Sequence, residues 1–302
     1  MPFLYLLESI RFPLGDRLFG WVTYLGDETL FIVAGVFVFW CVNKLEGYYL
    51  LSVGLTGSVI NQWLKLIFRI PRPWVIDENF TIVESARAAA TGYSFPSGHT
   101  QNAVGTYAGA ALWSRKKWVR ALLILVAVLV PFSRMYLGVH TPLDIGVAAL
   151  TALALVFALY PVFKKGDEKA ISLVFAGMTA LSLAFVLYVS LASFPAEMDA
   201  ANLLSGVKNA WTLLGCSAGL WLVYEIERRY IRFETGAPFG WQVFKLVVGF
   251  GLVMAIRVGS KALLSAVFGD VAWINAVRYF LMILFAGCAW PLTFKRLPGK
   301  RQ

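Results

Sequence analysis

Charged side chains are scarce in this chain. They make up 15% of its 302 residues, whereas apolar residues make up 59% and the mean hydropathy is +0.70. An ordinary soluble domain has about 25% charged residues, so this composition excludes that class and indicates an integral membrane protein. Strict alternation of apolar and polar residues is also absent. We therefore expect an all-α, polytopic membrane helical bundle rather than a β-barrel.

Cysteines are few, and they form no pattern. Cys41, Cys216 and Cys288 lie far apart in sequence, each inside an apolar run and without the spacing of metal ligands. We interpret them as small buried side chains. They do not indicate the redox compartment of the protein.

The N-terminal stretch lacks the features of a cleaved signal peptide. No basic segment precedes its apolar residues, and Glu8 interrupts them. Further along, apolar side chains are interspersed with Arg11, Asp16 and Arg17. We expect residues 1–27 to form an interfacial amphipathic segment.

Long apolar runs fill most of the remaining sequence. Each approaches the roughly 20 residues that cross a bilayer as a helix, which predicts about nine transmembrane helices. We expect a membrane core over residues 28–165 and a C-terminal extension of four helices over residues 166–302. The runs cover residues 28–43, 47–68, 99–114, 117–132, 143–163, 170–192, 207–226, 240–257 and 271–294.

Lys and Arg are unevenly spread over the connecting loops, and in short loops they mark the cytoplasmic side. If Lys44 is cytoplasmic, alternation of the spans places four further basic segments on the same side, at 115–120, 164–169, 228–232 and 295–301. The loops 69–96, 134–140 and 194–206, the last containing Glu197, then lie outside. Because this bias accounts for most of the net charge of +10, we expect no nucleic-acid partner.

Only two histidines occur, and the first ends the segment Pro96-Ser97-Gly98-His99. Ser97 is a good N-cap for the apolar helix expected to follow. The free N–H groups of that helix start could bind an anion, and Gly98 would let an oxyanion approach the backbone. His99 could then exchange a proton beside the anion. The alternative is plain helix capping with an exposed histidine.

The second histidine, His140, precedes Thr141-Pro142-Leu143-Asp144, which indicates another helix start. Asp144 could fix one ring nitrogen of His140 and leave the other free as a nucleophile. Alternatively, Asp144 only complements the helix dipole. Arg134 can share this site, since it lies six residues before His140 across an expected turn.

Two more cations stand upstream. Lys65 lies near the outer end of an expected span, and Arg72 lies between Pro71 and Pro73, which end any helix there. Isolated cations at such positions usually snorkel to the interface. Three cations, a helix start and two histidines at one membrane face together suit a phosphate group.

Three short motifs, in this order and spacing, resemble the complete signature of the type 2 phosphatidic acid phosphatase (PAP2) superfamily, which includes lipid phosphate phosphatases, glucose-6-phosphatase and vanadium haloperoxidases. No motif position departs from the pattern. The resemblance implies a PAP2-like helical core within the membrane core expected over residues 28–165. The second half of the chain has no matching motif. The motifs are Lys65 with Arg72-Pro73, Pro96-Ser97-Gly98-His99, and Ser133-Arg134 with His140 and Asp144.

The resemblance implies a role for each motif residue. His140 would attack phosphorus and form a phosphohistidine, oriented by Asp144, while His99 would protonate the leaving alkoxide and later activate water. No metal or other cofactor is implied. The residues that would bind the phosphate oxygens are Lys65, Arg72, Ser97, Gly98 and Arg134.

The function expected from these observations is metal-independent hydrolysis of a lipid phosphate at the extracytoplasmic face. A site at the bilayer edge can receive the head group of phosphatidic acid, a sphingoid-base phosphate or a polyprenyl diphosphate, while the tail stays among membrane lipids. One alternative is a phosphotransferase that uses a lipid or sugar acceptor instead of water. Another is a non-catalytic transporter of the same fold. The short loops favour a bacterial plasma membrane.

Two polar residues of the C-terminal extension stand inside the last expected span. Asn275 and Arg278 could recognise a head group, because polar groups within a span usually face protein or a cavity. Alternatively, Arg278 pairs with an acid such as Glu225 or Asp270.

Overall fold

A computed structural model of the chain describes residues 1–195 and 198–296. These residues form helices and connecting loops without a β-strand, which confirms the all-α class. Glu197 and the basic residues Lys300 and Arg301, which enter the orientation argument, lie outside the described residues.

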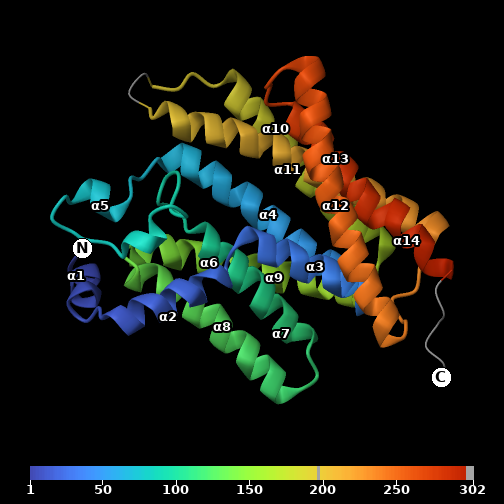
Figure 1. Ribbon diagram of the computed structural model, residues 1–302, viewed down its shortest axis with the longest axis horizontal. Helices are drawn as coiled ribbons and strands as arrows, with labels where there is room; N and C mark the ends of the chain where they lie inside the picture. The colour runs from blue at the N-terminus through green and yellow to red at the C-terminus, as the bar shows by residue number, and fades with distance from the viewer. Residues whose placement is uncertain (196–197, 297–302) are drawn as a thin grey trace. The chain divides into compact units, whose positions relative to one another are not determined.

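Helices follow one another along the chain (Figure 1). The first half contains α1 (Pro2–Ser9), α2 (Pro13–Tyr24), α3 (Glu28–Cys41), α4 (Lys44–Phe68), α5 (Pro73–Ile76), the 3₁₀ turn η1 (Glu84–Ala86), α6 (Gly98–Ala103), the π-helix η2 (Val104–Ala108), α7 (Gly109–Trp113), α8 (Lys117–Tyr136) and α9 (Pro142–Lys165). The second half contains α10 (Glu168–Leu191), α11 (Ala200–Ile226), the π-helix η3 (Glu227–Ile231), α12 (Phe239–Phe268), α13 (Ile274–Leu284), the π-helix η4 (Phe285–Ala289), α14 (Trp290–Leu292) and the 3₁₀ turn η5 (Thr293–Arg296).

Every predicted apolar run coincides with a helix, but the number of nine spans is not confirmed. Among the described residues, five helical segments are long and apolar enough to cross a membrane, and a sixth results if the bent pair α2 and α3 counts as one span. These five are α8, α9, α10, α12 and the segment from α13 to η5. The expected N-terminal segment consists of two helices, and α2 meets α3 at an angle of 46°.

Polar residues explain why other helices do not meet these criteria. The apolar part of the 25-residue helix α4 contains Asn61, Gln62, glycines and tyrosines, which lower its hydropathy. The helix that starts at Gly98 is divided by the π-helix η2 into short α-helical pieces. In contrast, α12 continues eleven residues past its predicted end, because the arginine and lysine that interrupt its apolar run are good helix formers.

The chain forms two compact units. The first comprises residues 1–35, 49–161 and 195–205, apart from the undescribed 196–197. Within it α8 packs against α2, α6 and α7, and all motif residues belong to this unit. The long loop 69–97 is held to neighbouring segments by backbone hydrogen bonds from Val83 N to Leu137 O (3.1 Å) and from Ser97 N to Asp144 O (3.2 Å).

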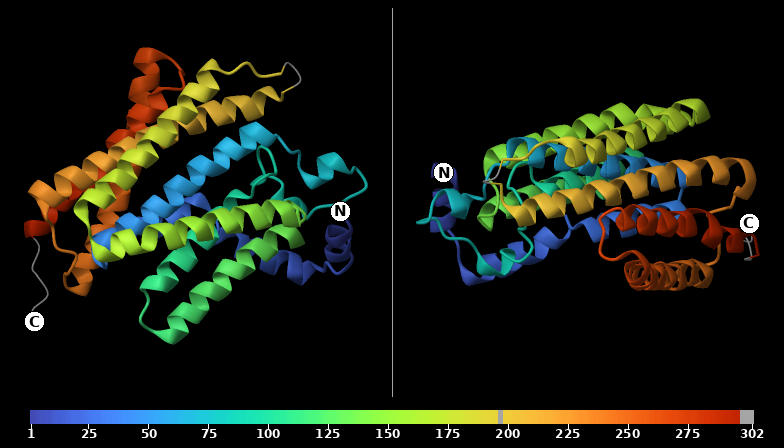
Figure 2. Two further views of the ribbon diagram at one scale, coloured as in Figure 1. Left: turned by 180° about the vertical axis from the view of Figure 1, so that it is seen from behind. Right: turned by 90° about the horizontal axis from the view of Figure 1, so that it is seen from above.

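The second unit comprises residues 36–48, 162–194 and 206–296 of the described chain. Its core is aromatic, and its ring contacts include Tyr48 against Phe175 and Tyr224. Lys44 forms an ion pair with the buried Glu227 at 2.7 Å. The antiparallel helices α12 and α13 of this unit pack side by side (Figure 2).

Candidate active site

The turn between α8 and α9 positions the second histidine. Gly138 has a φ of +81°, a left-handed conformation that glycine adopts without strain. His140 follows, and α9 begins at Pro142. At this start Thr141 N donates to Asp144 Oδ2 (2.8 Å), while Asp144 N donates to Thr141 Oγ1 (3.3 Å). The predicted helix start is confirmed, and its reciprocal cap fixes Asp144 one turn beyond His140.

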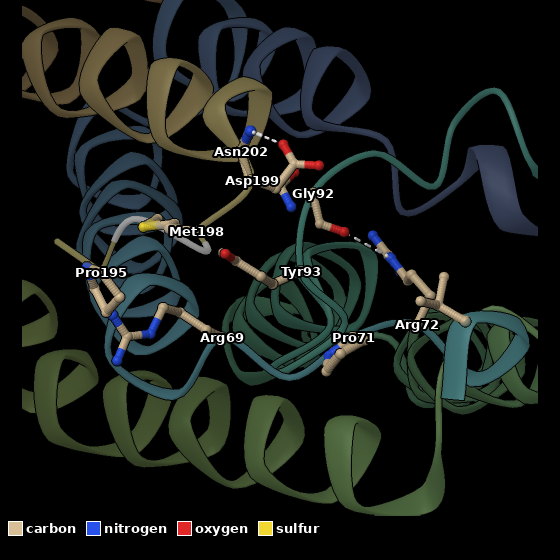
Figure 3. Close-up of a pocket in the computed structure, with 10 residues that line it drawn as sticks. Arg69, Pro71, Arg72, Gly92, Tyr93, Pro195, Met198, Asp199 and Asn202 are labelled. Carbon is tan, nitrogen blue, oxygen red and sulfur yellow. Dashed lines mark hydrogen bonds between the residues drawn. The ribbon is translucent and has the colours of Figure 1, made fainter. Parts of the chain in front are cut away.

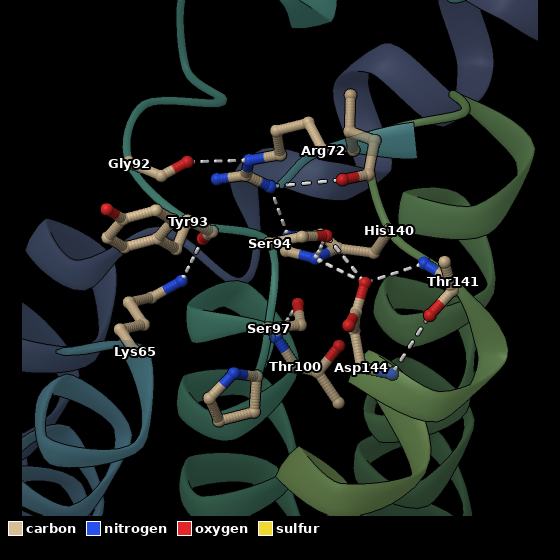
Figure 4. A network of polar contacts seen from close by, with 12 residues as sticks. Lys65, Arg72, Gly92, Tyr93, Ser94, Ser97, Thr100, His140, Thr141 and Asp144 are labelled. Carbon is tan, nitrogen blue, oxygen red and sulfur yellow. Dashed lines mark hydrogen bonds and ion pairs between the residues drawn. The ribbon is translucent and has the colours of Figure 1, made fainter. Parts of the chain in front are cut away.

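Asp144 faces the imidazole through the same carboxylate oxygen. Its Oδ2 lies 3.5 Å from His140 Nδ1 and accepts a 2.6 Å hydrogen bond from Ser94 Oγ. Ser94 Oγ in turn lies 3.4 Å from His140 Nδ1 (Figure 4). All three side chains are buried. The contact between carboxylate and imidazole is therefore long, and the serine hydroxyl connects the two groups.

Arg72 approaches the opposite edge of the imidazole. Its Nη1 lies 2.9 Å from His140 Nε2 and 3.0 Å from Val139 O, and its Nε and Nη2 donate to the carbonyls of Gly92 and Thr91. A guanidinium has donors only. His140 Nε2 is therefore the acceptor, which places the ring proton on Nδ1, facing Asp144 and Ser94.

Burial and charge keep this imidazole neutral. Desolvation is the largest effect that lowers the pKa of His140 well below its ordinary value, and the positive charges of Arg72, Arg134 and Lys65 act in the same direction. Burial lowers the pKa of Arg72 to about 10, so this group remains charged at neutral pH. The result is a neutral nucleophile candidate beside the charged guanidinium of Arg72.

The start of α6 supplies the first histidine. Ser97 caps this helix by accepting a hydrogen bond from Thr100 N at 3.3 Å, as predicted. The N–H groups of Gly98 and His99 come next and have no intrahelical acceptor. Gly26 lies against His99, because a Cβ at Gly26 would come within 2.8 Å of the His99 carbonyl oxygen.

The other two predicted cations reach the site from α4 and α8. Lys65 Nζ donates to Tyr93 O at 2.6 Å. Arg134 is 1% exposed and donates from Nη1 to Thr23 Oγ1 at 2.7 Å, while its Nε has no partner among the described residues. Of the three predicted cations, Arg72 contacts the imidazole directly, and the charges of Lys65 and Arg134 add to the lowering of the pKa of His140.

A cavity of about 500 Å³ adjoins this cluster and shares Arg72 with it (Figure 3). Arg69 and Tyr93 line it from the long loop, and Asp199 and Asn202 line it from the start of α11. Asp199 Oδ1 accepts a hydrogen bond from Asn202 N at 2.8 Å, which fixes this edge of the cavity. His140 and Asp144 are almost fully buried, and this cavity meets their cluster at Arg72.

Sequence reasoning missed three residues that support the site: Ser94, Thr23 and Gly26. Ser94 precedes the second motif by two residues, yet a serine in a polar loop gives no signal of a distant carboxylate partner. Thr23 and Gly26 belong to the N-terminal segment, which was expected only to lie at the interface. Their contacts with the site depend on tertiary packing alone.

Comparison with known proteins agrees with this geometry. Residues 45–167 match the family model described as PAP2 superfamily, and residues 211–302 match that described as PAP2 superfamily phosphatase, transmembrane extension. A phosphatidylglycerophosphatase B of Bacillus subtilis (strain 168) is 31% identical over 173 residues, which cover 53% of this chain and 79% of that protein. The chain belongs to the PAP2 superfamily. The resemblance seen in its motifs is confirmed, and the chain is an integral membrane phosphatase of the PAP2 type.

Further PAP2 relatives cover smaller parts of the chain. Phosphatidylglycerophosphatase B of Escherichia coli (strain K12) is 29% identical over 181 residues, 45% of this chain and 71% of that protein. Undecaprenyl-diphosphatase BcrC of Bacillus subtilis is 31% identical over 107 residues, 35% of this chain and 52% of that protein. The crystal structure of Aquifex aeolicus LpxE matches 52% of this chain and 92% of its own, with 28% identity and a TM-score of 0.45.

Proposed function

We propose that this PAP2 phosphatase hydrolyses a lipid phosphate through a phosphohistidine on His140, without a metal. The observation that carries the proposal is the position of the imidazole, with Nε2 toward Arg72 and the protonated Nδ1 toward Ser94 and Asp144. An Nε2 lone pair is the electron pair that attack on phosphorus requires. The transporter hypothesis gains no support, because the relatives are phosphatases.

In the first step, His140 Nε2 forms a bond to phosphorus as the bond to the leaving alkoxide oxygen breaks. His99 donates a proton to that oxygen, and Asp144 stabilises the imidazolium that forms. In the second step, His99 removes a proton from water, whose oxygen displaces His140 from phosphorus. Inorganic phosphate leaves, and both histidines return to their initial protonation states.

Phosphate binding requires Arg72 to exchange one partner. A phosphoryl group cannot fit between Arg72 Nη1 and His140 Nε2, which lie 2.9 Å apart. We infer that a phosphate oxygen replaces the imidazole as acceptor for Nη1, while the carbonyls of Thr91 and Gly92 keep the rest of the guanidinium in place. The remaining oxygens would be held by Lys65, Arg134, Ser97 and the Gly98 N–H.

The lipid nature of the substrate follows from the setting of the site and from the relatives. Arg134 and Asp144 stand at the ends of the membrane helices α8 and α9, and the adjoining cavity combines Arg69 and Asp199 with amide and phenol groups that suit a polar head group. The relatives are named for phosphatidylglycerophosphate and undecaprenyl diphosphate. Their bacterial origin also supports a bacterial plasma membrane, and the distribution of Lys and Arg over the loops predicts that the site lies at its extracytoplasmic face.

The decisive experiment measures products from the purified, reconstituted protein. The substrates are phosphatidic acid, phosphatidylglycerophosphate, sphingosine 1-phosphate, undecaprenyl diphosphate and glucose 6-phosphate. We expect free phosphate from at least one lipid, vanadate inhibition, and an acid-labile phosphoprotein that is absent from His140→Ala. A phosphorylated glycerol or sugar acceptor in place of free phosphate would instead identify a phosphotransferase. Retained turnover in His140→Ala would reject the mechanism.

The orientation of the chain in the membrane has its own test. Ser85 lies exposed on the long loop, and Lys116 lies exposed on a predicted cytoplasmic segment. In a background in which the three native cysteines are replaced, Ser85→Cys should react with a membrane-impermeant maleimide in intact cells, whereas Lys116→Cys should react only after lysis. The reverse pattern would place the site in the cytoplasm.

A further inference from the structure

Three cations lie on the helical hairpin of α12 and α13, away in sequence from every catalytic motif. Arg257 and Lys261 stand four residues apart on α12, so they share one face of the helix, and Arg278 stands on α13. The helix α12 and the segment from α13 to η5 are each long and apolar enough to span a membrane. Ionisable groups in such segments are costly to keep and usually serve a function.

These cations line a common cavity of about 560 Å³, together with Ser265 and Tyr279. All of its lining residues belong to the second compact unit. The cavity thus offers three positive charges and two hydroxyl groups between neighbouring membrane helices.

Arg278 is held firmly in this cavity. It is 8% exposed, donates from Nη1 to Asn275 Oδ1 (2.9 Å) and from Nη2 to Arg257 O (3.2 Å), and its Nε has no partner among the described residues. The alternative of pairing with an acid such as Glu225 or Asp270 is wrong, because Arg278 forms no ion pair with a carboxylate among the described residues and Glu225 instead pairs with Arg228 and Arg229. An acceptor is still missing for one buried donor.

The charge of the cavity is uncompensated by the protein. None of the three cations forms an ion pair with a carboxylate in the described part of the chain. A ligand that complements them needs negative charge and several acceptor oxygens, which a phosphate group provides. Basic pockets between membrane helices are a known means of binding phospholipid head groups.

The surface beside the cavity favours a lipid as the source of that phosphate. Val258, which also lines the cavity, is 70% exposed, and Met254, one turn earlier on the same face of α12, is 47% exposed. An acyl chain can cover such side chains within a bilayer. We propose that the cavity of α12 and α13 binds the phosphate of an anionic membrane phospholipid, at a site separate from the catalytic residues. Free inorganic phosphate shares this chemistry, so the test has to distinguish the two.

The test uses the full-length protein in detergent and phosphatidylglycerol, a phosphodiester that carries no terminal phosphate to hydrolyse. Native mass spectrometry compares phosphatidylglycerol with phosphatidylcholine, whose head group has no net charge. The double variant Arg257→Gln, Lys261→Gln should bind phosphatidylglycerol at least about ten-fold more weakly. The control Lys208→Gln, Arg296→Gln removes the same charge elsewhere and should bind as the unmodified protein does. Hydrolysis of a soluble phosphomonoester by both variants verifies that they fold.

Each outcome bears on the proposal. Selective loss of phosphatidylglycerol in the first variant, without displacement by millimolar inorganic phosphate, supports a lipid site. Displacement by inorganic phosphate in the unmodified protein identifies the free anion as the ligand of the same cavity. The proposal is overturned if both variants bind the lipid equally well. It is also overturned if the unmodified protein retains phosphatidylglycerol and phosphatidylcholine equally. Lipid held at the catalytic cluster does not confuse the comparison, because neither variant alters that cluster.

Discussion

Ser94 Oγ donates a 2.6 Å hydrogen bond to Asp144 Oδ2 and lies 3.4 Å from His140 Nδ1. The hydroxyl group therefore occupies the space between a carboxylate and an imidazole that are themselves 3.5 Å apart. A buried group at this point orients both partners, even though it touches no reacting atom. Ser94 is a positioning residue of the proposed mechanism.

Replacing Ser94 by alanine should lower kcat about ten- to a hundred-fold, the range found when groups that orient a functional histidine are removed. KM should change little, because the phosphate-binding cations stay in place. Ser94→Thr keeps a hydroxyl and should recover part of the activity. Ser85→Ala, an exposed position on the same loop, is the matched control and should behave like the unmodified enzyme. A purely structural role would lower the thermal stability of Ser94→Ala without this loss of kcat.

Arg72 should not tolerate lysine, although the charge is retained. Its guanidinium donates to three carbonyl oxygens and to His140 Nε2 at the same time, a pattern that a single ammonium group cannot reproduce. Hydrogen bonds to charged groups contribute about 1.5–3 kcal/mol each, so kcat/KM should fall at least about a hundred-fold. Arg87→Lys is the control, since Arg87 is exposed, pairs with Glu84 and lies over the ring of Trp74, without contact to His140. Near-normal kcat/KM in Arg72→Lys would contradict the proposed role in phosphate binding.

Two glycines of the N-terminal segment should respond differently to alanine. A Cβ at Gly26 would lie 2.6 Å from Val130 Cγ1 and 2.8 Å from the His99 carbonyl oxygen, whereas Gly20 has no neighbouring atom within 4 Å. Overpacking of this kind costs about 1–3 kcal/mol and displaces the start of α6. We expect Gly26→Ala to have reduced activity even at temperatures well below its melting temperature. Gly20→Ala should keep its full activity. Equal activity of the two variants would show that Gly26 does not position His99.

The parts of the site that follow from sequence are those encoded by local rules. A serine after a proline predicted the cap of α6, and the Thr141-Pro142 start with Asp144 predicted the reciprocal cap of α9, because capping depends on residues a few positions apart. Ser94 and Thr23 could not be found in this way. Their partners lie 50 and 111 residues away, so the contacts arise only when helices and loops pack.

The same distinction applies to the membrane helices. Apolar runs located the helices well, yet nine spans are not confirmed, because the helix that contains Lys65 is less apolar, and the helix that contains the π-helix η2 less regular, than the runs suggested. The end of α12 was placed too early at Arg257. The apolar run ends there, while the structure continues the helix and places Arg257 in a cavity.

The pH dependence of kcat/KM tests the protonation state of His140. The pKa of this imidazole is lowered well below its ordinary value of about 6.5, chiefly by burial and then by Arg72, Arg134 and Lys65. A lowered pKa means that the neutral form persists as the pH falls below 6.5, so the acid limb of kcat/KM, which reports the free enzyme, should lie below that value. The substrate phosphate also titrates near pH 6, and two monoesters with different second pKa values separate the effects. A limb that moves with the substrate belongs to the substrate, and a limb fixed at or above pH 6.5 would show that His140 takes up a proton too readily to serve as the neutral nucleophile.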